Sequence, residues 1–316
     1  MRYQRLILTA ACGGILSSLL LTGCFTGIES TPRITYKEVQ GNNAEASSPE
    51  EALAASFMPE TFGQWKAGKE FYVTSPRISL VLATESTGTP MPCQGDTLVY
   101  AGNREINDLT GKSVVELLFT DKKTEATFSY RTNASASELS ERNLVDVPFT
   151  IDLSLISLVR GAIAGKELYI KTPIWFDKKG TTSVTGRKFI RIKVTDVHPG
   201  NDVHPCLVTF TDGTATEKAV LMSCSTATRS TTRDFPSLFS ISNPRLNYPQ
   251  ISDSVWDDII NARISQGMTK TEATLALGTP RNIDRGYNHT ATYERWTYPD
   301  GIVLIFEDGL LVRFNK

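Results

Sequence analysis

Apolar and polar positions divide the chain into stretches of different periodicity. Residues 6–21 form an almost continuous apolar stretch, and residues 25–60 are rich in Ser, Thr, Asn and Glu with few large apolar side chains. Beyond Trp65, short runs of β-branched and aromatic residues lie between clusters of Gly, Pro and Asp, and residues 187–194 alternate strictly. This pattern predicts short antiparallel strands with one wet and one buried face, so we expect a body that is mainly β.

An internal repeat organises the β-rich region. Residues 68–76 match residues 165–173, and residues 116–121 match residues 207–212, in the same order and at similar spacing. A repeat of this kind indicates two copies of one supersecondary unit. Strands this short suit small closed barrels, and the copies look similar to the Src-homology-3-type barrels of envelope proteins.

One helix is predicted between the two copies. Residues 152–163 place apolar side chains at helical spacing, with Asp152 as a possible N-cap and Gly165 as a possible stop. We expect this helix to pack between the β units, and a helix that binds a partner is the alternative.

The last part of the chain predicts a small α+β module. Residues 253–264 have the spacing of an amphipathic helix, and a second helix begins at a capping box formed by Thr269 and Glu272 and ends at Gly278 and Pro280. Alternating runs separated by Gly-containing turns follow between Glu294 and Phe314. They predict a three-stranded meander, preceded by a polar loop that holds Tyr287 and His289.

This module resembles the SmpA/OmlA (BamE-like) family of outer-membrane lipoproteins. The motif residues of the module are Gly267, Met268, Thr269, Glu272, Leu277, Gly278, Pro280, Trp296, Tyr298 and Gly309. The resemblance covers about the last 65 residues and implies a scaffold that docks on envelope or outer-membrane proteins, although the same fold also occurs in secreted inhibitors. Family members are typically little more than this domain, whereas here two β units precede it. A cap, a helix stop and a core aromatic face also have a purely structural explanation.

The start of the chain resembles the export segment of bacterial lipoproteins. Arg2 and Arg5 precede the apolar stretch, which ends in residues 21–24, a sequence similar to a lipobox. The resemblance implies cleavage before Cys24 and attachment of lipid to its thiol. An ordinary cleaved signal peptide and a permanent anchor are the alternatives, but the apolar stretch is short for the ~20 residues of a spanning helix.

These predictions give a fold that is mainly β with an α+β part: two small antiparallel β-barrel-like repeats and a two-helix, three-stranded BamE-like domain. The expected divisions are a lipoprotein signal peptide at 1–23, a tether at 24–60, repeats at 61–135 and 165–245, a connecting helix at 136–164 and a BamE-like domain at 250–316.

The charge balance of the chain bears on its partners, and its cysteine content bears on disulfide pairing. The 33 basic and 34 acidic residues nearly cancel, so no net field attracts nucleic acid, and we expect no nucleic-acid partner. Of the five cysteines, Cys93, Cys206 and Cys224 lie in the body. Cys206 and Cys224 flank a predicted hairpin and form a possible disulfide, with two buried free thiols as the alternative.

No motif predicts catalysis. His198, Asp202, His204 and Cys206 are potential zinc ligands, but they lie in a turn rich in Pro and Gly and no second ligand pair stands at metal-site spacing. The chain has neither a Gly-x-Ser-x-Gly elbow nor a phosphate-binding glycine loop. We therefore predict no catalytic residue, no metal and no cofactor.

Two functions remain for the body. The first is a lipid-anchored, non-enzymatic scaffold or binding protein that meets envelope proteins in outer-membrane protein assembly or envelope integrity. The second is a module that binds a cell-wall polymer in grooves lined by Tyr72, Tyr100, Tyr169 and Trp175. Phe25 and Thr26 are uncharged and give no retention signal of the aspartate type, so the outer membrane is the expected location.

Replacement of the acceptor cysteine tests the anchor. We expect Cys24→Ala to leave an unprocessed precursor without incorporated lipid, because the resemblance implies that lipid attaches to this thiol before cleavage. Metabolic labelling with a fatty acid, together with gel mobility, measures both properties. Normal processing with retained label would show that the anchor lies elsewhere.

Overall fold

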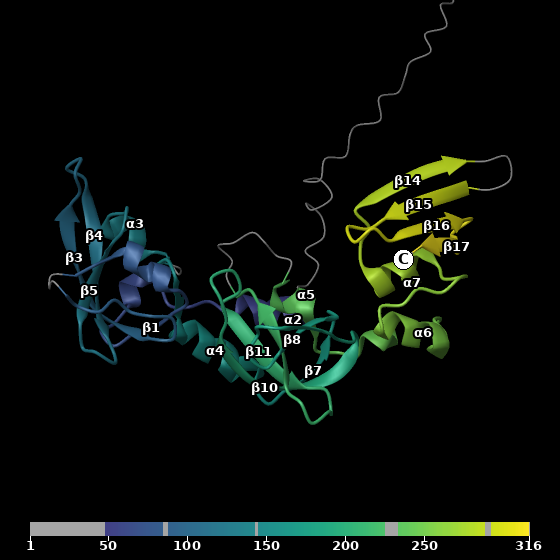
Figure 1. The fold of residues 1–316 in the computed structure, drawn as a ribbon, viewed down its shortest axis with the longest axis horizontal. Helices are drawn as coiled ribbons and strands as arrows, with labels where there is room; N and C mark the ends of the chain where they lie inside the picture. Colours follow the sequence, from purple (N-terminus) through teal and green to yellow (C-terminus); the bar gives the residue numbers. More distant parts are fainter. Residues whose placement is uncertain (1–47, 85–87, 143–144, 225–232, 288–291, 316) are drawn as a thin grey trace, which may run out of the picture. The chain divides into compact units, whose positions relative to one another are not determined.

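The computed structural model describes residues 48–84, 88–142, 145–224, 233–287 and 292–315, which lie within the compact unit Ser47–Lys316. In these residues the protein is mainly β, as predicted, with three antiparallel sheets and short helices (Figure 1).

The first sheet has six strands in the order β2-β5-β4-β3-β1-β6. They are β1 (Glu70–Val73), β2 (Leu82–Ala83), β3 (Thr97–Asn107), β4 (Ser113–Asp121), β5 (Thr127–Arg131) and β6 (Thr150–Asp152). The 3-10 turns η1 (Phe62–Gln64) and η2 (Pro76–Leu80) and the helix α3 (Ala136–Ser140) lie among them. One side of the sheet covers a core that contains Phe71, Leu117, Phe119 and Phe128.

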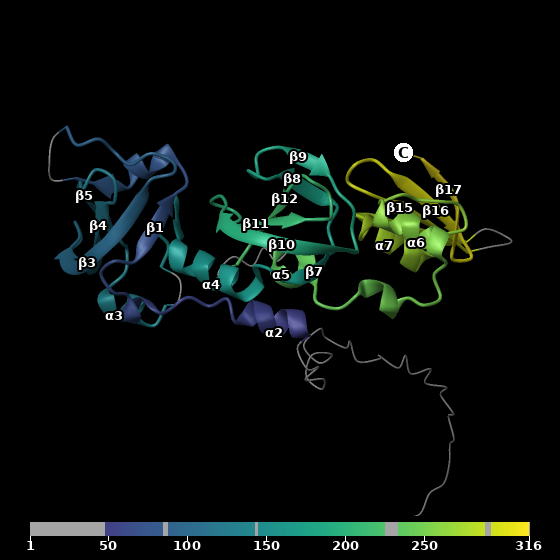
Figure 2. The same cartoon turned by 90° about the horizontal axis from the view of Figure 1, so that it is seen from below.

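The second sheet has seven strands in the order β13-β7-β10-β11-β12-β8-β9. They are β7 (Glu167–Ile170), β8 (Ile174–Asp177), β9 (Ser183–Thr185), β10 (Ile190–Pro199), β11 (Cys206–Thr211), β12 (Lys218–Met222) and β13 (Phe239–Ser240), with α5 (Phe235–Leu238) before the last strand. Figure 2 shows β9 beside β8 at one end of this sheet.

The two sheets are two copies of one topology. The strands β1 to β6 occupy the places that β7, β8, β10, β11, β12 and β13 occupy in the second sheet, and β9 is the additional strand. In each copy the strand that follows the first strand pairs with the last strand of a three-stranded meander, and a short helix then leads to a final strand that pairs with the first. The internal sequence repeat therefore corresponds to a structural repeat.

The repeated Gly-Lys pair explains why the motif recurs. In the first copy Gly68 N–H donates to Tyr100 O at 2.8 Å, and Tyr100 N–H donates to Lys69 O at 2.7 Å. Gly165 and Lys166 make the same two bonds with Val194, at 2.9 and 3.0 Å. Both glycines have positive φ, which other residues rarely adopt. Each bonded residue directly precedes a β-bulge, so the motif holds the first strand against the bulge.

The predicted closed barrels are wrong. Within the described residues no ladder joins β2 to β6 or β9 to β13, so both sheets stay open. The strands β2, β6 and β13 are only two or three residues long and offer too few hydrogen bonds for closure. The first copy also runs past the expected boundary at residue 135, because β6 pairs with β1.

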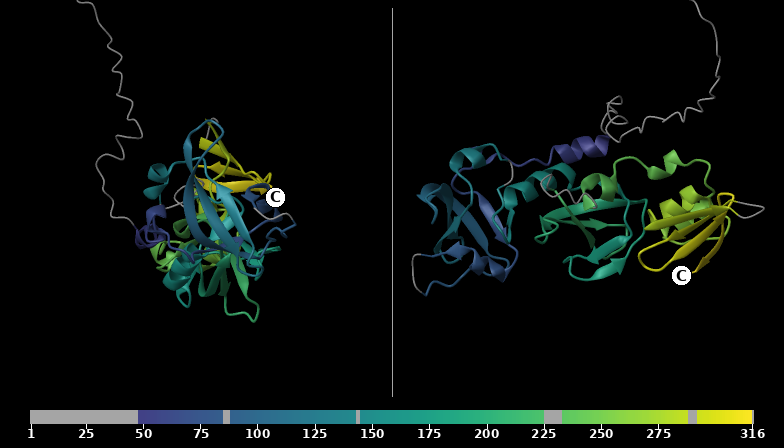
Figure 3. Two further views of the ribbon diagram at one scale, coloured as in Figure 1. Left: turned by 90° about the vertical axis from the view of Figure 1, so that its left-hand side faces the viewer. Right: turned by 90° about the horizontal axis from the view of Figure 1, so that it is seen from above.

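Helices at the start of the body and between the copies both pack on the core of the second sheet. The helix α4 (Leu153–Ile163) begins at the N-cap Asp152, as predicted, and buries Leu155, Ile156, Val159 and Ile163 in the core of the second sheet. The helix α2 (Pro49–Ala55), purple in the right panel of Figure 3, begins at Ser48. Phe57, just after it, packs edge-on against Phe235 with ring centroids 5.8 Å apart. Residues from Ser48 on, which were assigned to the tether at 24–60, therefore belong to the packed body.

The C-terminal part combines two helices with a third sheet. The helices are α6 (Asp253–Ile260) and α7 (Lys270–Leu277), preceded by the 3-10 turn η4 (Pro244–Asn247). The strands β14 (Asn282–Tyr287), β15 (Thr292–Thr297), β16 (Val303–Glu307) and β17 (Leu310–Asn315) pair in sequence order. The capping box of Thr269 and Glu272 is present, and α7 ends at Gly278 with a φ of 88°.

The predicted two-helix, three-stranded BamE-like domain is wrong, because the sheet has a fourth strand. The segment that was expected to be a polar loop forms β14, which pairs with the whole length of β15. Gly286 leaves room for the ring of Tyr293, and Arg285 donates to Glu294 at 3.2 Å. Hydrogen bonds from Lys270 first, and also from Trp296 and Arg285, lower the pKa of Glu294 to about 2. Polar side chains, and not alternating apolar ones, stabilise this strand. Its sequence therefore lacks the apolar alternation from which a strand is predicted.

Two glycine-to-alanine substitutions test the packing in opposite directions. A Cβ at Gly186 would overlap the indole of Trp175, which is fully buried, so Gly186→Ala should destabilise the protein by about 1–3 kcal/mol. Gly161 lies exposed in α4 with open space around it, so Gly161→Ala should stabilise by about 0.5–1 kcal/mol. Urea unfolding measures both. Equal effects of the two substitutions would contradict the packing around Trp175.

Candidate functional site

The first sheet has one face that no other described element covers with an apolar layer. Successive side chains of a strand point to opposite sides, so residues that alternate with the core residues Leu117, Phe119 and Phe128 lie on the outer side. We call this outer side the open face. Its residues are Ala83 on β2, Arg104 on β3, Glu116, Leu118 and Thr120 on β4, and Thr127, Ser129 and Arg131 on β5.

A hollow of about 300 Å³ lies on the open face. Ala83, Ala101 and Leu118 contribute apolar surface to it, and Thr120, Thr127 and Ser129 contribute hydroxyl groups. Ala101 is the extra residue of the bulge in β3, so the bulge widens the hollow on that side. The arrangement can accept an apolar group of moderate size with polar atoms around it.

A buried carboxylate lies at one end of the hollow. Glu116 is only 6% exposed, and its Oε2 accepts from Arg104 Nε at 2.6 Å. Ser129 Oγ donates to Glu116 Oε1 at 3.2 Å. Arg131 stands directly opposite Glu116 in the ladder between β4 and β5. Among the described residues, the Glu116 carboxylate therefore lies between two arginines, of which Arg131 is exposed.

The equivalent face of the second sheet is apolar. The ladder registers place Glu116 and Arg131 in the first copy where Leu207 and Leu221 stand in the second. By the same comparison, Ser129 corresponds to Ala219 and Ala83 corresponds to Phe176. Leu207, Ala219 and Leu221 are buried and form a small cluster with Phe176.

The second copy covers this face with its own chain. Phe176 lies on the cluster, and the hairpin of β8 and β9 continues over it, since Gly180 lies against the side chain of Leu207. The first copy has Ala83 where the second has the phenylalanine. The two copies therefore share a topology but differ in whether the outer face is filled.

A second, polar hollow of about 370 Å³ lies near Lys69. The Lys69 ammonium is buried and contacts Asp152 at 2.8 Å, Glu60 at 3.1 Å and Ser154 Oγ at 2.7 Å. Ser154 Oγ in turn donates to Asp152 at 2.6 Å. Each of the three donors of the ammonium thus has a partner. This cluster joins the segment before β1 to the start of α4, and we assign it a structural role.

The potential zinc ligands do not converge. His198 Nε2 lies 3.6 Å from Asp196 Oδ2, and Asp202 accepts a hydrogen bond from the Thr74 hydroxyl. His204 Nδ1 lies 2.9 Å from Ser223 Oγ, and burial lowers the pKa of this histidine. No cluster of three His, Cys, Asp or Glu side chains suited to a metal occurs in the part of the chain that the structure describes.

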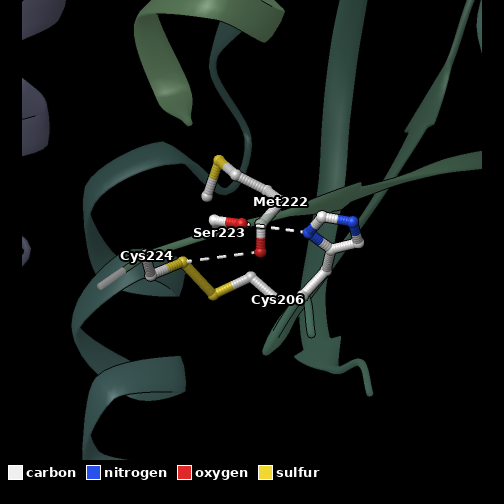
Figure 4. Close-up of a disulfide and its surroundings, with 5 residues drawn as sticks. Cys206, Met222, Ser223 and Cys224 are labelled. Carbon is white, nitrogen blue, oxygen red and sulfur yellow. Dashed lines mark hydrogen bonds between the residues drawn. A yellow bond between two sulfur atoms is a disulfide. The ribbon is translucent and has the colours of Figure 1, made fainter. Parts of the chain in front are cut away.

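Cys206 and Cys224 form a disulfide in the structure (Figure 4). Their Cα atoms are 6.8 Å apart, and Cys224 lies two residues beyond Met222, the ladder partner of Cys206. Cys93 is free and exposed. The pair that flanks the predicted hairpin is therefore joined, which leaves one free thiol in the described body.

The other residues selected from the sequence have structural positions. Met268, Trp296 and Tyr298 are buried in the C-terminal core, and the Tyr298 hydroxyl donates to Gly278 O at 3.1 Å. Of the aromatic residues proposed for a polymer-binding groove, Tyr100 and Trp175 are buried, whereas Tyr72 and Tyr169 are partly exposed. Cys24 and the lipobox lie outside the described residues.

Comparison of the chain with protein-family models, with curated proteins and with solved structures finds no match. Among the described helices, none has the length and apolar character needed to cross a bilayer. The function is therefore argued from the geometry of the site.

The open face was not predicted from the sequence, although the repeat contains a signal for it. Glu116 and Leu207 occupy the same place in the second repeated motif, one charged and one apolar. Such a difference at equivalent positions indicates that the outer face of the sheet is polar in the first copy and apolar in the second.

Peptide mapping without reduction tests the cysteine pairing. We expect one linked peptide pair that joins Cys206 to Cys224, and alkylation of Cys93 without reductant. Replacement of both linked cysteines by Ala should cost about 2–4 kcal/mol of stability, whereas Cys93→Ser should have no effect. A bridge from Cys93 to either of the other two would contradict the structure.

Proposed function

We propose that the protein is a lipid-anchored, non-enzymatic binding protein of the outer membrane, and that it meets partner envelope proteins through the open face of its first sheet. The observation that carries this proposal is the difference between the two copies. One copy fills its outer face with its own chain, and the other exposes a hollow with a charged end.

The anchor follows from the resemblance of residues 21–24 to a lipobox. Burial of acyl chain contributes about 0.8 kcal/mol per methylene, so one chain holds a protein marginally and two or more chains hold it stably. A lipidated Cys24 would keep the body beside a bilayer. Recognition would then occur between neighbours at the same membrane.

The chemistry of the open face favours binding over catalysis. The carboxylate of Glu116 is shielded and hydrogen-bonded by Arg104 and Ser129, so it presents no reactive oxygen to a ligand. What the face offers is an apolar hollow, hydroxyl groups and positive charge. These features suit a protein segment, because interface cores combine apolar contact with a few directed polar groups.

In-cell photocrosslinking tests this function on the full chain. A benzophenone amino acid at Thr127, on the rim of the hollow, should crosslink to envelope proteins. The control is the same group at Ala215, which is exposed in the turn between β11 and β12. We expect at least a tenfold stronger protein adduct from position 127, and loss of that adduct in the Cys24→Ala background.

Equal adducts at the two positions, or an adduct at position 127 that contains only cell-wall polymer, would contradict the proposal. Sedimentation of the purified full chain with cell wall provides the second readout. The protein-binding function predicts no sedimentation.

A further inference from the structure

We propose that the open face binds an extended segment of a partner protein in which an aromatic residue and a carboxylate residue stand two positions apart. This inference rests on the proposed function and specifies its ligand.

The second copy shows which group fits the equivalent surface. There the ring of Phe176 packs with the buried side chains of Leu207 and Leu221 on the outer side of the sheet. In the first copy Ala83 occupies the corresponding place, and the missing ring leaves the hollow. An aromatic side chain from another protein would restore the cover that the first copy lacks.

The lining of the hollow favours an aromatic group over a charged one. Leu118, Ala83 and Ala101 present apolar surface, and a charge placed on such a surface would lose hydration without a partner. A ring buries a large apolar area and has few rotatable bonds, so it loses little conformational entropy on binding. The surrounding hydroxyls of Thr127 and Ser129 can contact the backbone of the bound segment.

The second group is specified by charge and spacing. Leu118 pairs with Ser129, and Glu116 pairs with Arg131, two positions away along the same strands. This step is about 6.6–6.8 Å in a β-strand, which equals the distance between residues i and i+2 of an extended peptide. Arg131 is exposed and stands opposite Glu116, whose Oε2 is bonded to Arg104. A ligand carboxylate two residues from the ring would therefore reach the guanidinium group of Arg131.

A peptide array probed with the full lipidated chain in detergent tests the inference. The peptides are octamers of Ser, Thr and Gly that carry Phe and Asp two positions apart. Matched peptides replace Phe with Ser, replace Asp with Asn or Lys, or place the two residues side by side. We expect binding of the Phe-x-Asp peptide to be at least tenfold stronger than binding of each matched peptide.

Substitutions in the protein test the location. Ala83→Phe introduces the residue that covers the second copy and should reduce binding at least tenfold, whereas Ala215→Phe, in an exposed turn, should leave binding unchanged. Thermal unfolding checks that both variants fold. Arg131→Glu provides an independent test, because it should reverse the preference from Phe-x-Asp to Phe-x-Lys.

Binding that does not depend on the aromatic residue, or an unchanged preference for Asp in Arg131→Glu, would overturn the inference. Undiminished binding by folded Ala83→Phe would also overturn it. These results are distinct from failure of the proposed function: protein adducts at position 127 can persist when the array shows no preference for Phe-x-Asp.

Discussion

A β-sheet needs an apolar cover on one face, and what happens on the other face determines what the sheet can do. In this protein the two copies of one topology differ in what covers the second face of the sheet. The second sheet has a core under one face and the hairpin of β8 and β9 over the other. The first sheet has a core under one face and the open face, with Glu116 and Leu118, on the other.

The shared framework makes the difference interpretable. Gly68 and Gly165 hold equivalent strands against equivalent bulges, so the ladder registers of the two copies can be compared residue by residue. The helix α4 and the residue Phe57 bury apolar side chains in the core of the second sheet. The second copy thus has more internal packing, which is consistent with a supporting role for it and a binding role for the first.

Local features of the fold could be predicted from the sequence. The N-cap of α4 and the capping box of α7 depend on residues near each other in the chain, and each lies where it was expected. Features that depend on pairing between distant residues were missed. The strand β14 is stabilised by contacts to β15, including the ion pair of Arg285 and Glu294, and its own sequence has little apolar alternation. For the same reason three strands were predicted in the last sheet where four exist, and small closed barrels were predicted where the end strands are too short to pair.

The candidate site is also a product of long-range register. That Ala83 corresponds to Phe176 follows only once β2 is paired with β5 and β8 with β12. The most direct test of the open face is the accessibility of a cysteine on it, in a Cys93→Ser background of the full chain. Thr127→Cys and Ala215→Cys are compared for their rate of maleimide labelling in intact envelopes and after purification. The account predicts that position 127 is protected at least tenfold in envelopes and becomes accessible on purification, whereas position 215 is labelled equally in both. Equal labelling of position 127 in the two states would contradict it.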